Sequence, residues 1–187
     1  MPAKPVPKPV QKWRRFPHDL TKPFSQVAAM ERVFSGHSAE IRKMERRFPD
    51  EPHRAWLGTE AEKEIDERVR HEIFGHHGEK FEQFMHELLA LGPNKQAASF
   101  VNFVRKKSGT KDPKAILGDA LAAASGSKIF AGRVLKANSE LGASSQKPTP
   151  IQAMAIDAFD TYAREYSGLL DNLISQIKPR LQKKAPR

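Results

Sequence analysis

The sequence of 187 residues contains no cysteine. Disulfide bonds, thiolate zinc sites and thiol catalysis are therefore excluded, and any metal site must use histidine and carboxylate ligands. Long apolar runs are missing as well. No stretch approaches the ~20 residues that a membrane-spanning helix needs, and the N-terminus has no apolar segment of signal-peptide length. We therefore expect a cytoplasmic protein without a membrane span.

Strand patterns are also absent, because no segment of strand length alternates apolar and polar residues, and no internal repeat recurs. Helix start and stop signals are frequent instead. Thr59 and Glu62 form a capping box, Asp112-Pro113 and Thr149-Pro150 read as helix starts, and Gly126 reads as a helix end. The predicted helical segments are 25–34, 38–48, 59–91, 94–107, 113–125, 127–142 and 150–178. The sequence thus predicts an all-α fold, a compact bundle of about six to seven helices with a long C-terminal helix.

The clearest helical signal is the last segment, which Pro179 is expected to end. Its 29 residues would span about 43 Å. Apolar residues recur there mainly at spacings of three and four: Ile151, Ala155, Ala158, Tyr162, Tyr166, Leu169, Leu173 and Ile177. Such a stripe is typical of a core seam, and the alternative is a homo-oligomer interface through the 150–178 helix.

The chain ends differ in composition from the helical part. Residues 1–23 alternate proline with lysine and valine, which favours a disordered basic arm. We therefore divide the chain into a flexible arm (1–23), one helical domain (24–178) and a basic tail (179–187). Within the arm, a phosphate-binding and base-stacking role is a hypothesis for Lys12, Trp13, Arg14 and Arg15, and a solvated tail is the alternative.

The formal net charge is +10, which favours an anionic partner such as nucleic acid. Basic side chains outnumber acidic ones by 12 to 6 in residues 1–58 and by 16 to 7 in residues 92–187, whereas acidic ones lead by 9 to 4 in residues 59–91. Two basic clusters are candidates for one phosphate-tracking surface: Arg42, Lys43, Arg46 and Arg47 in the first, and Arg105, Lys106, Lys107 and Lys111, with Lys114, in the second. The alternative for the second cluster is a solvated helix end, where cations suit the helix dipole.

The acidic stretch contains the run Arg70-His71-Glu72-Ile73-Phe74-Gly75-His76. On an ideal helix, positions five apart are separated by about 140°, which is unsuitable for one metal ion bound by His71 and His76. The apolar face shifts by about one residue between Ile73 and Phe81, so the helix must be distorted there. A π-bulge near Gly75 would align both histidines, whereas a plain break at Gly75 or Gly78 would bind nothing.

From His71 the run continues to Gly78. It resembles the HExxxH variant of zinc peptidases, including the HExxGH signature of the dipeptidyl peptidase III family. It also resembles the HExxGHxG segment of zincin-like domains in large polyvalent phage and plasmid proteins. The resemblance covers eight residues and implies zinc bound by His71 and His76, with Glu72 as the general base. The third ligand that the first family supplies from a downstream Glu-Glu-x-x-x-Asp motif has no counterpart here. Glu140, Asp157, Asp160 and Glu165 are isolated candidates.

Two main functions follow as hypotheses. The first is a non-enzymatic helical module that binds nucleic acid or another polyanion, in a phage, plasmid or other mobile element, and needs no cofactor. The second is a small HExxxH zinc metalloprotein, with a peptidase as one form of it. An oligomeric scaffold or effector built on the C-terminal helix is a third.

Overall fold

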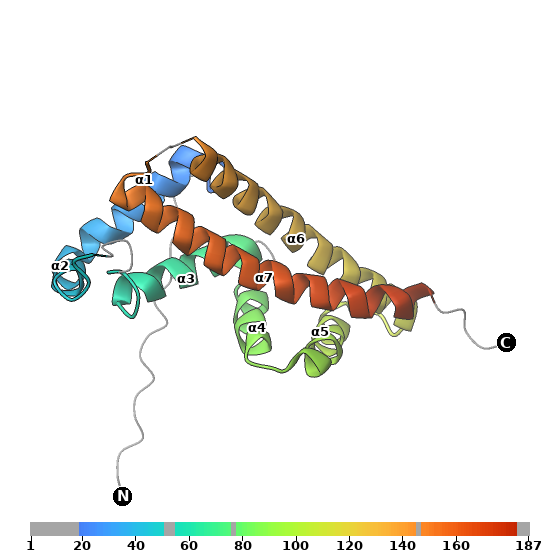
Figure 1. Ribbon diagram of the computed structural model, residues 1–187. Helices are drawn as coiled ribbons and strands as arrows, with labels where there is room; N and C mark the ends of the chain where they lie inside the picture. The colour runs from blue at the N-terminus through green and yellow to red at the C-terminus, as the bar shows by residue number, and fades with distance from the viewer. Residues whose placement is uncertain (1–18, 51–54, 76–77, 145–146, 183–187) are drawn as a thin grey trace, which may run out of the picture.

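The computed structural model describes residues 19–50, 55–75, 78–144 and 147–182, and these residues contain seven α-helices and no strand (Figure 1). The predicted all-α class and the predicted number of helices are confirmed. The helices are α1 Pro23–Gly36, α2 Ser38–Glu45, α3 Glu60–Phe74, α4 Glu79–Leu89, α5 Pro93–Lys107, α6 Pro113–Ala143 and α7 Pro150–Gln182.

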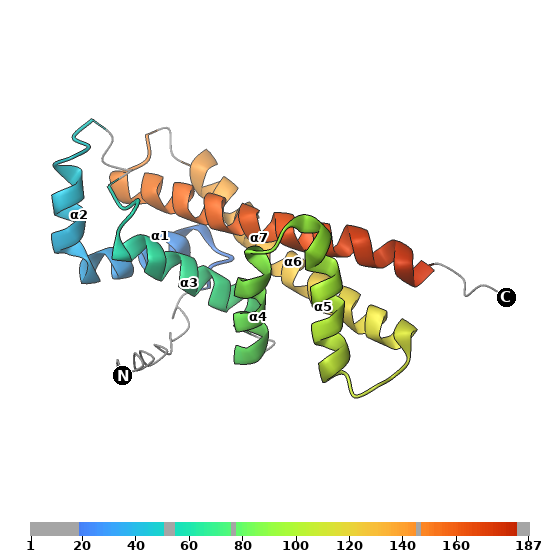
Figure 2. The same ribbon diagram turned by 90° about the horizontal axis from the view of Figure 1, so that it is seen from below.

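The two long helices, α6 and α7, run antiparallel along the length of the molecule, and the shorter helices pack against them (Figures 1 and 2). Both begin at the predicted caps. Asp112 accepts hydrogen bonds from the backbone N–H groups of Lys114 and Ala115. Thr149 and Gln152 bond reciprocally, side chain to backbone, as in a capping box. These caps satisfy N–H groups that the first turn leaves without helical partners.

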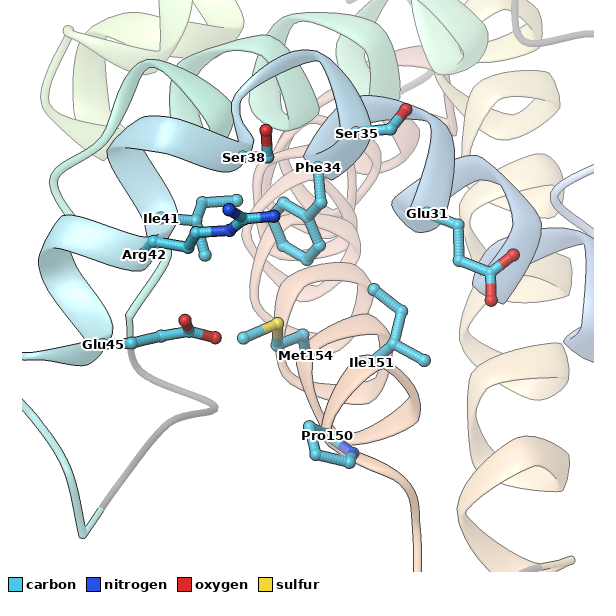
Figure 3. Close-up of a pocket in the computed structure, with 10 residues that line it drawn as sticks. All are labelled: Glu31, Phe34, Ser35, Ser38, Ile41, Arg42, Glu45, Pro150, Ile151 and Met154. Atoms are coloured by element: carbon cyan, nitrogen blue, oxygen red, sulfur yellow. The ribbon is translucent and has the colours of Figure 1, made fainter.

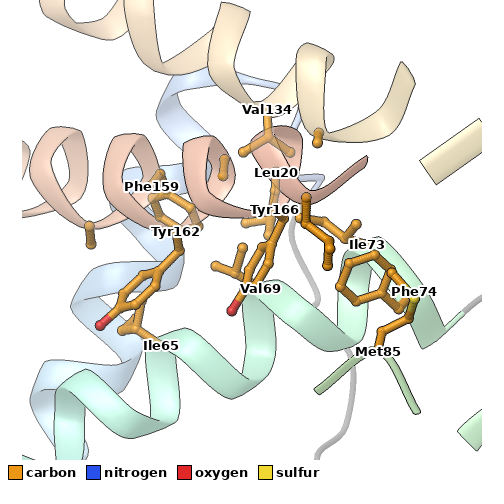
Figure 4. Close-up of a cluster of buried hydrophobic side chains, with 14 of the residues drawn as sticks. Leu20, Ile65, Val69, Ile73, Phe74, Met85, Val134, Phe159, Tyr162 and Tyr166 are labelled. Carbon is orange, nitrogen blue, oxygen red and sulfur yellow. The ribbon is translucent and has the colours of Figure 1, made fainter. Parts of the chain in front are cut away.

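The apolar stripe of α7 is a core seam, because its side chains are buried inside the chain. Tyr166, Leu170 and Leu173 are 0% exposed. Figure 4 shows Tyr162 and Tyr166 extending from α7 toward α3, where Ile65 packs beside them. Burying side chains of this size contributes about 1.5–3 kcal/mol each, so this seam is a principal source of stability.

Two predicted helix ends are wrong. The segments 113–125 and 127–142 form one continuous helix, α6, with Gly126 inside it. Glycine lowers helix propensity but keeps its backbone N–H, and the buried side of α6 continues from Ala124 through Ser127 to Ala131. Pro179 likewise lies inside α7, which continues for about one further turn to Gln182.

The predicted long segment 59–91 is two helices, because α3 ends at Phe74 and α4 begins at Glu79. Gly78 has φ +93° and ψ 159°, a backbone conformation that is accessible almost only to glycine. Of the two explanations for the shifted apolar face, the described residues therefore fit a break. The start of α3 is as predicted: Thr59 caps it by accepting from the Glu62 N–H, and Glu62 in turn accepts from the Gly58 N–H at 2.5 Å.

The described residues include part of the predicted arm: Leu20 is buried, and Asp19 accepts from both the backbone and the hydroxyl of Thr21. The rest of the predicted arm, and residues 183–187 of the predicted tail, lie outside the described residues. None of the described helices is both long enough and apolar enough to cross a membrane.

Candidate functional site

The elbow between α3 and α4 carries the first half of the His-Glu run. His71 lies in the last turn of α3, and its Nδ1 is 2.8 Å from the Glu82 Oε2 on α4. Both side chains are partly buried. Gly75 lies so close that a Cβ there would be 3.1 Å from the His71 ring. The absence of a side chain at position 75 thus makes room for the ring that joins the two helices.

A second contact joins the same helices through Arg70. Its Nη1 lies 2.6 Å from His86 Nδ1 on α4, and its Nη2 lies 2.5 Å from Asp66 Oδ2 one turn back on α3. Arg70 Nε also donates to the hydroxyl of Tyr166, which donates to the other oxygen of Asp66. The Tyr166 ring packs edge-on against Phe74, with 5.6 Å between centroids. This polar network of four residues, Asp66, Arg70, His86 and Tyr166, joins α3, α4 and α7.

The geometry determines the charge state of the network. Arginine can only donate, so His86 Nδ1 must be the acceptor and the ring must be neutral. Burial, together with the Arg70 charge, accordingly lowers the His86 pKa from 6.5 to about 4. Burial also raises the pKa of Asp66, against the opposing effect of its bonds to Tyr166 and Arg70. Burial and the neighbouring carboxylate raise the pKa of the Tyr166 hydroxyl, so it stays protonated.

The described residues do not complete a metal centre. No group of three histidine or acidic side chains in this part of the chain could hold a metal ion. Of the three residues in the predicted zinc site, His71 lies beside Glu82 and Glu72 is partly buried. The third, His76, lies outside the described residues. Glu82 was not among the third-ligand candidates, because sequence spacing does not reveal that α4 folds back on α3.

The second predicted basic cluster lies at the corner where α5 ends and α6 begins. Arg105, Lys106 and Lys107 form the last turn of α5 and are exposed, as is Lys111 in the connection. Lys114 in the first turn of α6 is exposed too. None of these five cations, which we call the α5–α6 basic corner, forms an ion pair with a described residue. Lys107 does lie over the Phe103 ring, 5.3 Å from its centroid.

Several basic side chains elsewhere are neutralised by neighbours. Lys63 pairs with Glu60 and Arg164 pairs with Asp160, and similar pairs hold Arg68, Arg70 and Lys128. The basic corner therefore differs from the surface of α3, where Lys63, Arg68 and Arg70 all pair with carboxylates.

The first basic cluster lies at the C-terminal end of α2: Arg42 and Lys43 are in its last turn, Arg46 and Arg47 follow it, and all four are exposed. Figures 1 and 2 place α2 at the opposite end of the molecule from the basic corner, with α3 and α4 between them. The expectation of one surface formed by both clusters is therefore wrong, because the chain doubles back through α3 and α4 between them. The cations of the arm, Lys12, Arg14 and Arg15, and the aromatic Trp13, lie outside the described residues.

A pocket of about 400 Å³ opens beside α2, between α1 and the start of α7 (Figure 3). Its apolar wall includes Phe34, Ile41 and Met154, and Arg42 extends from α2 over that wall. Glu45 lies on the same helix at the rim. Arg42 thus belongs to an apolar pocket as much as to the cationic surface of α2.

Comparison of the chain with protein-family models, with curated proteins and with solved structures found no significant match in any of the three.

The polar network was not predicted from the sequence, although all four of its residues are visible there. Arg70 and Asp66 have the i, i+4 spacing of a helical ion pair, which was a usable signal. His86 and Tyr166 join them only through the packing of α4 and α7 on α3.

Proposed function

We propose that this protein binds the phosphate backbone of nucleic acid without reading its sequence, and that the α5–α6 basic corner makes the main contact. The observation that supports this function best is the gathering of unpaired cations at this corner, in contrast to the paired cations of α3. Its five exposed cations have no described carboxylate partner, so their charge is available to an external polyanion. Cations that already pair with a carboxylate would gain less from a phosphate.

The last turn of α5 suits such contacts. Consecutive residues on a helix point about 100° apart, so Arg105, Lys106 and Lys107 fan around the helix end, and Lys111 and Lys114 extend the positive surface into the start of α6. Phosphate contacts of this kind release condensed counterions, which makes affinity salt-dependent and independent of base sequence. The α2 cations and the arm are proposed as secondary contacts, at a distance from the first.

The test is fluorescence anisotropy with labelled double-stranded DNA and RNA over a range of salt concentrations. The variant Lys106→Gln/Lys107→Gln/Lys111→Gln removes three unpaired cations. Since each phosphate contact contributes about 0.9 to the slope of log K against log salt, the slope should become shallower by about 2–3.

The matched control Lys63→Gln/Lys128→Gln/Arg164→Gln removes the same net charge from cations that are already paired. It should leave the slope nearly unchanged. The proposal would be refuted if the slope of log K against log salt decreased equally in both triple variants. It would also be refuted if the protein bound neither DNA nor RNA at low salt. Binding should also survive His71→Ala.

A zinc site is a second candidate, and one contact favours it. Glu82 lies against His71 Nδ1, and a carboxylate at one ring nitrogen commonly orients a histidine that binds metal through the other. In that case His71 and His76 would be ligands and Glu72 the general base. Elemental analysis of the purified protein should then find zinc, which His71→Ala abolishes and Glu82→Gln reduces. Zinc-free protein from zinc-supplemented cells would end this candidate.

A further inference from the structure

The outward face of α6 has no covering helix in the described part of the chain. One side of α6 packs against α7, and Figure 1 shows no element over its opposite side along the middle of the helix. Ile129 lies on this outward face and is 59% exposed, in contrast to the buried side chains on the α7 side. Ala122 and Gly132 on the same face are exposed as well.

Glycines on and beside this face have no role inside the chain. Gly118, Gly126 and Gly132 lie within α6, and a Cβ added at any of them would meet nothing within 4 Å. Glycine is the poorest helix former apart from proline, so three of them weaken α6 with no packing reason within the chain. Their small size does allow another backbone to approach closely.

The outward residues also recur at spacings of three and four, as in a helix that packs along a second helix. The series is Ala115, Gly118, Ala122, Ser125, Ile129, Gly132 and Lys136. When two such series are aligned antiparallel, Ile129 lies opposite Ser125, and Ala122 lies opposite Gly132. The one large apolar residue of each outward series then meets a small residue of the other.

The charges on the edge of this face select a second copy of the chain as the occupant. Asp119 and Arg133 lie seven residues before and after Gly126, so both are on the same edge, two turns from it in opposite directions. Neither forms an ion pair with a described residue. The pKa of Asp19 is lowered mainly by its hydrogen bonds from Thr21, and the Arg133 charge adds slightly to that effect. In the antiparallel alignment, with Gly126 near the two-fold axis, each Asp119 faces the partner's Arg133. Both ion pairs form at once, as an isologous interface requires.

We propose that two copies of this protein associate through the outward face of α6, with the two α6 helices antiparallel. This contact lies on α6 and not on the 150–178 helix, the alternative interface suggested by the sequence, because the apolar stripe of that helix is buried within the chain.

Light scattering coupled to size-exclusion chromatography tests the dimer with the full chain over a wide range of concentrations. The mass should approach twice the chain mass of 21.0 kDa as concentration rises. Ile129→Glu should leave a monomer. A mass that stays at one chain at every concentration, or a dimer unaffected by Ile129→Glu, would overturn the proposal.

Charge reversal tests the alignment and does not depend on Ile129. Asp119→Arg or Arg133→Asp alone should raise the dimer dissociation constant at least tenfold, because each places like charges opposite each other. The double variant should restore it to near the original value. Glu87→Arg, an exposed reversal on α4, should have no effect. If the double variant is no tighter than either single variant, the antiparallel α6 dimer is wrong. Unchanged helical circular dichroism confirms that each variant folds.

Discussion

The contact between Arg70 and His86 predicts a specific loss of stability in mild acid. His86 is neutral in the folded protein because Arg70 donates to its Nδ1, whereas the unfolded chain protonates the ring below pH 6.5. Between pH 6.5 and about 4 the unfolded state binds more protons than the folded state, so stability rises with pH across this window. Folding is therefore favoured above pH 6.5 and weakened as the pH falls toward 4.

The magnitude follows from the two pKa values. Each pH unit of that window corresponds to about 1.4 kcal/mol, which sets a ceiling of about 3 kcal/mol. Because the ring is only about half buried, solvent screening reduces the expected loss to about 1–2 kcal/mol. Asp66, whose pKa burial raises, also takes up a proton as the pH falls, so the effect of His86 must be isolated by comparison with a variant.

His86→Asn provides that comparison, because its amide oxygen can accept from Arg70 near the position of Nδ1 and does not titrate. Urea unfolding at several pH values between 7 and 4 should show the difference in unfolding free energy between the original protein and His86→Asn falling by about 1–2 kcal/mol. An NMR titration should place the His86 ring pKa near 4. Parallel stability curves, or a ring that titrates above 6, would refute this interpretation.

Two substitutions test other contacts by urea unfolding. Thr59→Ala removes the hydroxyl that caps α3 and should lower the free energy of unfolding by about 1 kcal/mol. Its control is Thr21→Ala, which removes an exposed hydroxyl outside any helix cap and should change stability less. Tyr166→Phe keeps the ring against Phe74 but removes the hydroxyl between Asp66 and Arg70, and should cost about 1–3 kcal/mol. A neutral result at either site would contradict the role assigned to that hydroxyl.

Helix positions could be predicted from the sequence where a cap is local. Thr59, Asp112 and Thr149 each bond to backbone or side-chain groups two or three residues away, so their patterns are visible in a short window. Gly126 and Pro179 could not be interpreted in the same way. Whether such a residue ends a helix depends on what the neighbouring turns pack against, and α6 and α7 support each other along their length.

The candidate sites, too, could be predicted only where they depend on residues close together in the sequence. The α5–α6 basic corner was predictable, because consecutive cations at the end of an amphipathic helix remain exposed in almost any packing. Its separation from the α2 cations was not predictable, since that depends on how the intervening chain folds back. The contact between His71 and Glu82 was not predictable either, because it depends on the angle at which α4 packs against α3.

That angle depends on the backbone of Gly78, which provides a last prediction. The sequence showed that the apolar face shifts between Ile73 and Phe81, but a bulge and a break shift it alike. Gly78→Ala introduces no clash, since a Cβ there meets nothing within 4 Å, yet φ +93° is unfavourable for alanine. It should cost about 1–3 kcal/mol in urea unfolding.

Gly36→Ala is a suitable control for that substitution. Gly36 ends α1 with similar open space at its Cβ and without a positive φ. This change should be neutral or slightly stabilising, because it reduces the freedom of the unfolded chain. If Gly78→Ala is as well tolerated as Gly36→Ala, the segment must adopt a backbone compatible with a side chain at position 78. The turn between α3 and α4 would then differ from the one described, and the π-bulge hypothesis, which aligns His71 with His76, would regain support.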